Sequence, residues 1–566
     1  MDNEFHRSNN IFSFWNAEQK RHIEFYFIKV DCVAEITAIN IRNLRCLRET
    51  GYVKIKPITV LVGRNSAGKS TFARSFPLFR QSVEEKKRAP ILWYGRLVDF
   101  GGFKDALNRD SDVSEIEFGF EMVADINTRI SSFWGTSHLW STSLLDPFKK
   151  EETNVEVKII IKQDSNNQNA FASKLEFIIH GNNISIELNN KNSVNTIFVN
   201  GDNVWATGVS TVKAIVNQRN IIPEITFAKS RRIRGNDNSE TTIWTPFDFM
   251  FENLVSSIFP HVHGNTSRTK VLSIINSIVV SDDSRLLASL KSIRASYTWR
   301  QYTSTLNLES KSFIYLKNRI YASLIVKLIE SIDDGLANYF LGVKYLEPLR
   351  ATTQRYYRRQ ELAIDEIDSK GTNVAMFLDS LTDREKQSFE AWMANHFKVI
   401  VGTSNEGGHI SLKIAESKGA PSTNLADMGF GFSQLLPIAV QLWSSIQTKG
   451  SIKSVRQNNT TCIVIEQPEL HLHPEYQARI ADVMVAAING SAENKNKISI
   501  IAETHSPNIV NRLGQLIEEG AINEDDVQVV LFENTKEGES NIRISNFNSD
   551  GVLQDWPYGF FEAEGY

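Results

Sequence analysis

The chain has 566 residues, 41% of them hydrophobic and 23% charged, which suits roughly two to four folded domains and excludes a wholly disordered chain. Its formal net charge of -4 excludes a protein that coats nucleic acid through bulk positive charge. Cys32, Cys46 and Cys462 are too far apart for a disulfide framework or a zinc site, so we expect a reducing cytoplasm. The polar N-terminus and the lack of a run of about 20 apolar residues predict neither a signal peptide nor a membrane span.

The first part of the chain is rich in aromatic residues without a clear period, and we expect an N-terminal extension over residues 1–32. Apolar residues then alternate with polar ones around Ile39 and around Val53, which predicts half-buried strands. The run at 58–62 is apolar throughout and predicts a buried central strand.

The character of the sequence changes between about 130 and 225, where short strand-like runs alternate with turns and predict an antiparallel β region. The predicted strands are at 155–161, 174–179, 184–188 and 196–199, with a hairpin turn at Asn200 and Gly201. From 281 to 341 the period becomes helical. The residues on one helical face are Leu324, Leu328, Ile329, Ile332 and Leu336. A further helix is predicted at 373–396, and alternating strands and helices after about 410 indicate an α/β lobe.

The segment from Gly63 to Ser70 matches the phosphate-loop pattern G-x-x-x-x-G-K-[ST]. Its glycines let backbone N–H groups turn toward phosphates, and the predicted helix at 71–79 presents its positive N-terminal end to the anion. Lys69 supplies a charge for the outer phosphates, and the Ser70 hydroxyl can ligate Mg²⁺. We therefore predict a site for ATP and Mg²⁺. The predicted nucleotide-binding residues are Gly63, Arg64, Asn65, Ser66, Ala67, Gly68, Lys69, Ser70 and Thr71.

Two further predicted strands end in residues that suit the chemistry of a P-loop enzyme. The apolar strand at 461–465 is followed by Glu466 and Glu469, and such acids hold the metal and the attacking water. The strand at 498–501 leads to His505, which can hydrogen-bond a γ-phosphate or orient a water molecule. The alternatives are surface acids that merely end a strand, and an ordinary polar turn residue at His505.

A second glycine-rich turn precedes the apolar helix predicted at 435–443. It contains Gly429, Gly431, Ser433 and Gln434, which together with the helix N-terminus form a second anion-binding surface. Because one chain needs only one such cradle for one ATP, we predict that this surface serves the nucleotide of another copy.

These four elements, in this order, resemble the ABC-type ATPase heads of the SMC and overcoming-lysogenization-defect-like group. The resemblance covers roughly 33–110 and 345–566, where 63–71 is similar to Walker A, 429–434 to a variant signature motif, 463–469 to Walker B and His505 to the switch histidine. It implies an α/β, ABC-type P-loop ATPase head, and a homodimer in which ATP lies head-to-tail between one Walker A and the other signature.

The run from Glu466 to Pro474 is similar to the ATPase subunits of bacterial antiphage systems, among them Septu and retron-associated Septu-like systems. The segments 345–350 and 555–562 strengthen this resemblance. We expect four parts in the chain. These are the extension at 1–32, the first part of the head at 33–130, a β-rich and helical insertion at 131–344, and the second part of the head at 345–566.

The sequence departs from the ABC pattern at the end of Walker B. The expected metal acid is Glu466, where Asp is usual, and the next position is Gln467, where the usual residue is the catalytic Glu. A Gln can position a water molecule but cannot take its proton, so Glu469 is the nearest alternative carboxylate. Gln81 is too close to the P-loop helix to be assigned as the Q-loop glutamine. The candidate catalytic residues are Glu466, Gln467, Glu469 and His505, and the candidate metal ligands are Ser70 and Glu466.

A basic segment with interleaved tyrosines suits a nucleic-acid backbone with base stacking, although a solvated face or a contact to nucleotide or partner explains it equally well. It comprises Arg350, Arg355, Tyr356, Arg358 and Arg359. His471 and His473 suit either metal ligation or packing at the seam of a dimer.

We expect an ATP-binding, slowly hydrolysing ATPase that acts as a homodimeric sensor or regulator of a separate effector, a nuclease, in bacterial antiphage defence. One alternative is a DNA-repair or chromosome-associated ATPase that acts directly on DNA. The other is a nucleotide-gated scaffold with negligible turnover, for which Gln467 is the indication.

Overall fold

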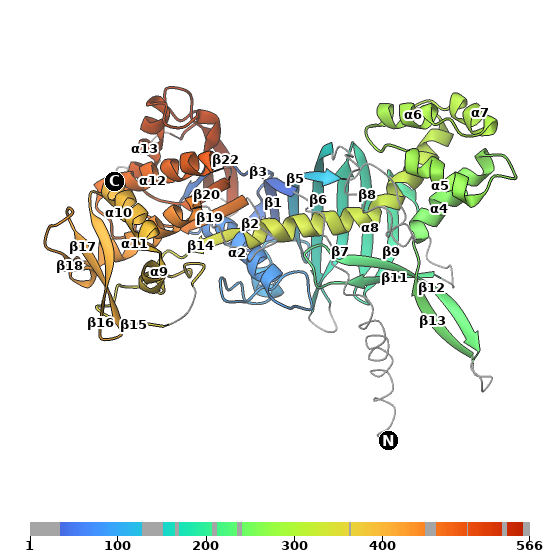
Figure 1. Cartoon of the computed structure of the whole chain (residues 1–566). Coiled ribbons are helices and arrows are strands. Elements are labelled where there is room, and N and C mark those ends of the chain that lie inside the picture. The colour runs from blue at the N-terminus through green and yellow to red at the C-terminus, as the bar shows by residue number, and fades with distance from the viewer. Residues whose placement is uncertain are drawn as a thin grey trace, which may run out of the picture. The chain divides into compact units, whose positions relative to one another are not determined.

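The computed structural model describes residues 34–126, 151–164, 169–205, 212–234, 240–360, 364–447, 460–494, 496–534 and 540–557. The chain from Val33 to Tyr566 forms one compact unit, whose elements are labelled in Figure 1. The expected extension at 1–32 and residues 558–562 of the expected C-terminal segment lie outside the described residues. No helix in the described ranges has the length and hydropathy that crossing a bilayer requires.

A mostly parallel sheet carries the predicted phosphate loop. Its strand order is β14 (Val343–Leu346), β19 (Thr460–Glu466), β20 (Lys497–Glu503), β4 (Ile58–Gly63), β21 (Val527–Asn534) and β22 (Ser540–Asn546). Neighbouring strands pair in parallel except for β22, which runs antiparallel to β21. The predicted strands at 58–62, 461–465 and 498–501 are therefore confirmed as β4, β19 and β20.

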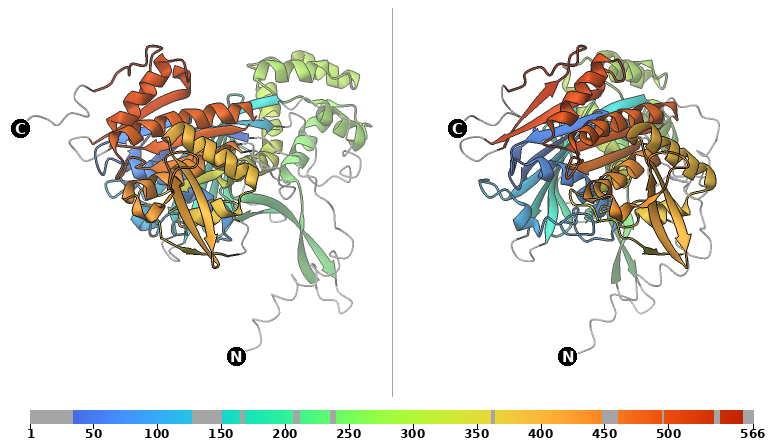
Figure 2. Two further views of the ribbon diagram at one scale, coloured as in Figure 1. Left: turned by 60° about the vertical axis from the view of Figure 1, so that its left-hand side comes forward. Right: turned by 90° about the vertical axis from the view of Figure 1, so that its left-hand side faces the viewer.

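Helices cover both faces of this sheet, which explains why its strands are apolar without alternation. In β4, Leu61 packs into the hydrophobic cluster of α2 (Lys69–Glu84) and α8 (Lys311–Leu341), whereas Val60 packs into the opposite cluster. The opposite cluster contains α9 (Val374–Ser380), α10 (Asp383–Phe397), α11 (Phe430–Ile446), α12 (Pro474–Glu493) and α13 (Pro507–Glu518). Figure 2 shows α11, α12 and α13 gathered around this part of the sheet.

The second large sheet is antiparallel, with the strand order β10, β9, β8, β7, β6, β5, β1 and β2, and with β3 also paired to β1. Its strands are β1 (Ala34–Leu44), β2 (Leu47–Glu49), β3 (Val53–Lys54), β5 (Glu115–Ile126), β6 (Glu151–Gln163), β7 (Ala170–Ile179), β8 (Asn182–Asn189), β9 (Ser193–Val199) and β10 (Asp202–Asn203). The four strands predicted at 155–199 are confirmed as β6 to β9. The Asn200–Gly201 turn has positive φ at both residues, 51° and 84°, as a tight hairpin turn requires.

This sheet runs across the expected boundary at residue 130. Strand β5, from the expected first part of the head, pairs along its whole length with β6, from the expected insertion. Likewise β1 pairs with β5. The β region is therefore a continuation of the sheet that begins at Ala34, because hydrogen bonds join its strands directly to those of the head.

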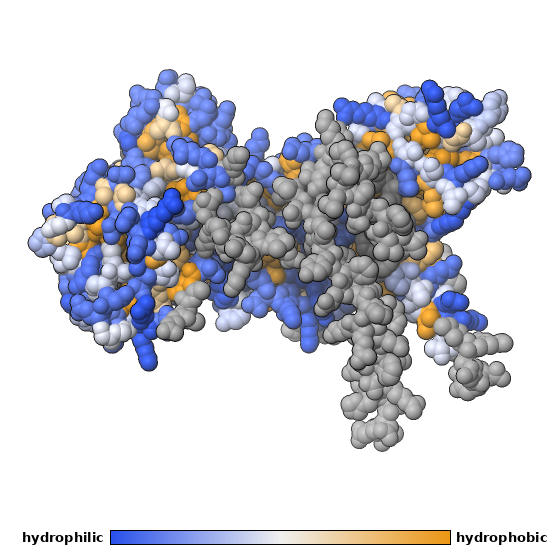
Figure 3. Space-filling view, viewed as in Figure 1, coloured by the Kyte–Doolittle hydropathy of each residue, from blue (hydrophilic) through white to orange (hydrophobic). Residues whose placement is uncertain are grey.

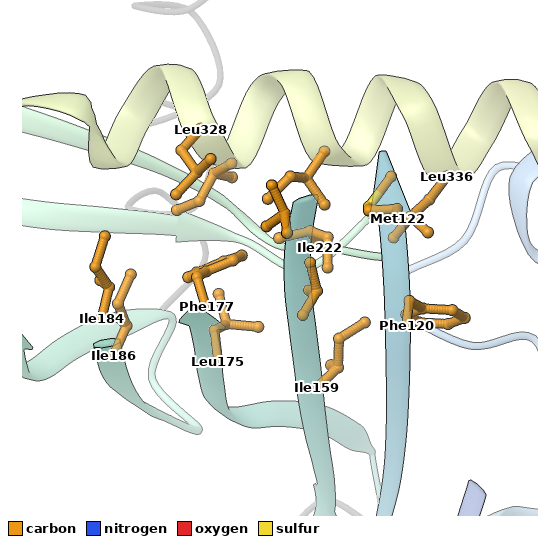
Figure 4. Packing of buried hydrophobic residues seen from close by; sticks show 14 of the residues in the cluster. Phe120, Met122, Ile159, Leu175, Phe177, Ile184, Ile186, Ile222, Leu328 and Leu336 are labelled. Carbon is orange, nitrogen blue, oxygen red and sulfur yellow. The ribbon is translucent and has the colours of Figure 1, made fainter. Parts of the chain in front are cut away.

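The long helix α8 packs the antiparallel sheet against the P-loop helix. Its predicted apolar face is confirmed, and Figure 4 shows Leu328 and Leu336 directed at sheet residues that include Phe120 and Phe177. Near the other end of α8, the ring of Phe340 stacks on Phe79 of α2 with the ring centroids 4.6 Å apart. The insertion and the P-loop helix thus share one hydrophobic core.

Smaller elements complete the unit. The insertion also contains β11 (Val212–Asn217), β12 (Glu224–Arg234), β13 (Glu240–Pro246), α4 (Phe249–Ile258), η2 (Phe259–His261), α5 (Arg268–Ser277), α6 (Asp283–Ser292) and α7 (Tyr297–Thr305). The remaining elements are α3 (Phe103–Ala106), β15 (Tyr357–Arg358), β16 (Ile400–Glu406), β17 (His409–Ala415), β18 (Thr423–Asn424), η3 (Leu425–Asp427) and η4 (Glu524–Asp526). Helix α10 starts with a capping box between Thr382 and Glu385, and with α9 it fills the helical stretch predicted at 373–396.

An ion pair between the buried Arg80 and the partly buried Glu366 joins the P-loop helix to the segment after β14. Arg80 donates from Nη2 to Glu366 Oε2 at 2.7 Å and from Nη1 to the carbonyl of Val343 at 2.6 Å. Burial raises the pKa of Glu366, but the hydrogen bonds from Arg80 and the charge of Lys344 outweigh it and lower that pKa to about 2.

We predict that Glu366→Gln lowers the free energy of unfolding by about 2 kcal/mol at pH 7, because the buried Arg80 then keeps only Glu84, at 2.9 Å from its Nε, as a charged partner. Since the folded-state pKa is depressed, the stabilisation is full above the ordinary pKa of 4.5 and is lost as the pH falls toward 2. Denaturant titrations at pH 7 and pH 3 measure both effects. The exposed pair of Arg543 and Glu533 is the control, and Glu533→Gln should cost less than about 1 kcal/mol. Equal costs for the two variants would contradict the prediction.

Candidate nucleotide site

The phosphate loop joins the end of β4 to the start of α2, as the sequence predicted. Gly63 has φ of 151°, and a Cβ there would lie 2.3 Å from the carbonyl oxygen of Phe532 on β21, so only glycine fits. Gly68 is the N-cap of α2 with φ of 104°. Arg64, Asn65 and Ser66 are exposed. The loop therefore offers accessible backbone at the N-terminus of a helix, which is the arrangement that binds phosphate groups.

Lys69 is the buried cation of this loop. Its side chain donates from Nζ to the carbonyl oxygens of Gly63 at 2.9 Å and Arg64 at 2.8 Å. Burial lowers the pKa of Lys69, while the charges of Glu503 and Glu469 oppose that shift. The ammonium group is thus held inside the loop, and phosphate oxygens are stronger partners for it than the two carbonyls.

Glu466 lies at the end of β19, and both oxygens of its carboxylate accept hydrogen bonds from the chain itself. Arg74 on α2 donates from Nε to Oε1 at 2.7 Å and from Nη2 to Oε2 at 2.8 Å. Tyr345 on β14 donates its hydroxyl to Oε1 at 2.6 Å. The residue is 1% exposed. Glu466 therefore ties the P-loop helix to β14, and both of its oxygens already accept hydrogen bonds.

A second acid, Glu503, lies on the neighbouring strand and closer to the phosphate loop. Oε1 of Glu503 accepts a hydrogen bond from Ser70 Oγ at 2.8 Å. Oε2 is buried and has no hydrogen-bond partner among the described residues. Burial, and then the charge of Glu466, raise the pKa of Glu503 to about 7. A serine hydroxyl beside a buried carboxylate with an unused oxygen is a donor set that Mg²⁺ favours, so this edge of the sheet fits the expected ion.

Gln467 and Glu469 follow β19 in a tight turn. Gln467 has φ of 44°, and its N–H donates to the carbonyl oxygen of Glu503 at 2.8 Å. Both oxygens of Glu469 accept hydrogen bonds, one from the Thr504 hydroxyl at 2.8 Å and one from the His505 N–H at 2.7 Å. Burial raises the pKa of Glu469. Glu469 thus holds the 504–505 turn in place, which sequence reasoning did not foresee.

His505 is the exposed residue of that turn. Partial burial, and then the charge of Lys69, lower the pKa of His505, so the imidazole is neutral at pH 7. A neutral imidazole close to the P-loop lysine can donate a hydrogen bond to an outer phosphate or to a water molecule. Lys69 therefore lies close enough to Glu503 and to His505 for their charges to interact.

In the second glycine-rich turn, two of the four residues expected to bind an anion, Ser433 and Gln434, have other partners. Ser433 and Gln434 are buried, and they bond to the chain itself: Ser433 Oγ accepts from the Thr353 N–H at 3.2 Å, and Gln434 pairs with the backbone of Arg350. Gly429, the N-cap of α11, faces open space. The exposed part of this turn is thus its first residues, and Ser433 and Gln434 fix it to the 350–353 segment.

Arg350 is a correction to the expected nucleic-acid surface. It is 3% exposed and donates from Nη2 to the carbonyl oxygen of Glu466 at 2.7 Å, so its side chain cannot contact nucleic acid. Burial lowers the pKa of Arg350 to about 10. The four other residues of the segment lie at the surface, where Arg355 pairs with Asp427 and Arg359 with Asp379. The outer residues are Arg355, Tyr356, Arg358 and Arg359.

The other residues that the sequence singled out have structural partners. The side chain of Gln81 is buried and bonds to backbone groups of Leu92, Leu97 and Val98. His473 caps α12, and the His471 ring meets the Phe430 ring edge-on at 4.7 Å. Within the described ranges, no group of three or more His, Cys, Asp or Glu side chains could hold a metal ion.

Three side chains that sequence reasoning did not assign complete the site, namely Arg74, Tyr345 and Glu503. The signal for Glu503 was present, because it ends a predicted strand two residues before His505. Arg74 lies one helical turn after Ser70, a position that no motif marks.

The strand order and this loop together define an α/β P-loop ATPase. The chain belongs to the AAA ATPase domain family, whose model matches residues 35–510. No curated protein matches the chain.

Solved structures with some similarity are heads of Smc proteins. A Smc head bound to the C-winged helix domain of ScpA is 9% identical, with 90% of this chain and 97% of that chain covered and a TM-score of 0.34. The Smc head domain from Thermotoga maritima is 8% identical, with coverage of 90% and 98% and a TM-score of 0.31. A Smc head domain with a coiled coil and joint from Pyrococcus yayanosii is 9% identical, with coverage of 92% and 98% and a TM-score of 0.34. Because these scores are low, the fold is defined by the strand order of the protein itself.

Proposed function

We propose that this ATPase hydrolyses ATP slowly and acts as a homodimeric sensor or regulator of a separate effector, a nuclease, in bacterial antiphage defence. The observation that carries the proposal is Gln467. It occupies the position after the acid of β19, and its backbone is held against Glu503 in a left-handed conformation. An amide there can orient a water molecule but cannot remove its proton, so bound ATP is cleaved slowly.

The residues of the site have distinct tasks in this proposal. The backbone of the phosphate loop and Lys69 bind the phosphates, Gln467 orients the water, and His505 donates to the outer phosphate. Bound Mg²⁺ would neutralise phosphate charge, with Ser70 and a carboxylate at the strand ends as its protein ligands. Glu469 keeps His505 in position through the His505 N–H.

A dimer with ATP between two copies is supported by the start of α11. Met428 and Phe430 on either side of Gly429 are 42% and 40% exposed, so two apolar side chains lie together at the surface beside this turn. A second copy would cover these side chains while its ATP met the N-terminus of α11. In this arrangement Gly429 and Gly431 approach the nucleotide of the partner, and Ser433 and Gln434 hold the turn.

A surface for an effector is supported by the helices of the insertion. Tyr297, Leu308 and Tyr315 are 73%, 46% and 47% exposed. Figure 3 shows hydrophobic residues interspersed with hydrophilic ones over α4 to α7. Apolar patches of this kind often bind other proteins.

We predict that the purified chain does not cut single-stranded DNA, double-stranded DNA or RNA in the presence of Mg²⁺ or Mn²⁺, with or without ATP, because its chemistry is committed to the nucleotide site. Gel assays with purified wild type and Lys69→Ala test this. Cleavage that co-purifies with the chain and persists in Lys69→Ala would contradict the proposal of a separate effector.

The alternative function is an ATPase that acts directly on DNA, and the exposed Arg355, Tyr356, Arg358 and Arg359 favour it. Turnover measured with and without DNA separates the two. A DNA-stimulated rate that falls when Arg358 and Arg359 are replaced by alanine would favour the alternative, and negligible turnover in both cases would favour a scaffold.

A further inference from the structure

Glu466 at the end of β19 and Glu503 at the end of β20 differ in how many hydrogen bonds their carboxylates accept. Glu466 accepts three hydrogen bonds, two from Arg74 and one from Tyr345, at distances of 2.6–2.8 Å. A paired Arg–carboxylate contact of this kind is among the strongest polar interactions in proteins. Three of the about four acceptor positions of the Glu466 carboxylate are thus used, and a metal there would have to compete with the positive charge of Arg74.

The Glu503 carboxylate has more free acceptor positions than that of Glu466. Its residue is 2% exposed, yet Oε2 has no partner among the described residues. Leaving a buried carboxyl oxygen unpartnered costs roughly 1–3 kcal/mol, and a bound cation would satisfy it. Its other oxygen already lies 2.8 Å from Ser70 Oγ, the hydroxyl expected to ligate Mg²⁺.

The strand order explains why Glu503 is the better placed of the two. Strand β20 lies between β19 and β4, with Glu503 beside Glu466 on one side and beside Leu61 on the other. Glu503 is therefore one strand nearer to the phosphate loop. At the same edge of the sheet, the side chain of Arg74 from α2 is hydrogen-bonded to the Glu466 carboxylate.

We propose that Glu503 and Ser70, and not Glu466, hold the magnesium ion of this ATPase, while Glu466 positions Arg74 and Tyr345. The inference rests on the proposed ATP site. Both side chains supply oxygen donors, as Mg²⁺ prefers, and the phosphates and water molecules would supply the rest of its octahedral shell. The carboxylate that ligates the metal is thus at the end of β20, and not at the end of β19, where the sequence pattern predicts it.

The test is Mn²⁺ binding to the full chain in the presence of a non-hydrolysable ATP analogue, with free Mn²⁺ measured by electron paramagnetic resonance. For Glu503→Gln we expect the Kd for Mn²⁺ to rise at least about tenfold, since one anionic ligand is lost. Binding of the analogue without metal should remain or improve, because a negative charge beside the phosphates is gone. The matched control is Glu466→Gln, for which the Mn²⁺ Kd should stay within about threefold of wild type while the melting temperature falls.

Opposite results for the two variants would overturn the inference: Mn²⁺ binding retained in Glu503→Gln and lost in Glu466→Gln. If Glu503→Gln does not fold, Glu503→Asp, which keeps the carboxylate on a shorter arm, should fold and show an intermediate Kd, and an unchanged Kd would count against the proposal. Failure of the proposed function is distinguishable, because wild type would then bind neither the analogue nor Mn²⁺ with it.

Discussion

Replacing Lys69 with alanine should weaken ATP binding by about ten- to a hundredfold. The Lys69 ammonium lies inside the loop, bonded to the carbonyls of Gly63 and Arg64, and its pKa is lowered by burial. Each charge-assisted contact that it makes with phosphate is worth roughly 1.5–3 kcal/mol, which corresponds to that change in Kd. Isothermal titration calorimetry with ATP and Mg²⁺ measures the difference.

The control for this variant is Lys270→Ala, which removes an exposed lysine on α5 and should leave the ATP affinity within experimental error of wild type. An unchanged affinity in Lys69→Ala would mean that the loop from Gly63 to Ser70 does not bind the phosphates.

Replacing Gln467 with glutamate should raise the rate of ATP turnover by at least about tenfold. The change puts a proton acceptor at the position next to the end of β19, and a general base typically contributes about 10²–10⁴-fold. We expect less than the full effect, because the new carboxylate would lie near Glu503 and Glu469, whose pKa values are already raised by burial. Phosphate release under saturating ATP measures the rate.

Gln467→Asn is the matched control, because it keeps an amide and supplies no base, and its turnover should not rise. The residual activity of wild type should depend on Glu469 and His505. An undiminished rate in the double variant Glu469→Gln, His505→Ala would contradict this account of the site, as would equal rates in Gln467→Glu and Gln467→Asn.

The parts of the fold that the sequence predicted well are those governed by local pattern. The apolar runs at 58–62, 461–465 and 498–501 have no polar face, and they form β4, β19 and β20 at the centre of a covered sheet. The glycine pattern of the phosphate loop predicts the backbone conformation of the loop, because Gly63 and Gly68 have φ values that other residues rarely adopt.

The parts that the sequence did not predict depend on which strands become neighbours. Nothing local indicates that β20 separates β19 from β4, and this placement sets Glu503, rather than Glu466, against Ser70. The burial of Arg350 is of the same kind. Because Arg350 lies in a run of arginines and tyrosines, the sequence predicts that it is at the surface. Its side chain instead donates to the carbonyl oxygen of Glu466, 116 residues further along the chain.

The sequence also did not predict how the segments on the two sides of residue 130 are joined. The composition of the sequence changes there, but hydrogen bonds between β5 and β6 join the two segments in one sheet. The stacking of Phe340 on Phe79 then connects the insertion to the P-loop helix.

The most direct test of a slow ATPase is the steady-state rate of phosphate release by the purified chain at saturating ATP and Mg²⁺, compared with Lys69→Ala. We predict a rate well below the roughly 10 s⁻¹ that is the median for enzymes, and its loss in Lys69→Ala. A wild-type rate near that median, or a slow rate that survives Lys69→Ala, would contradict the account.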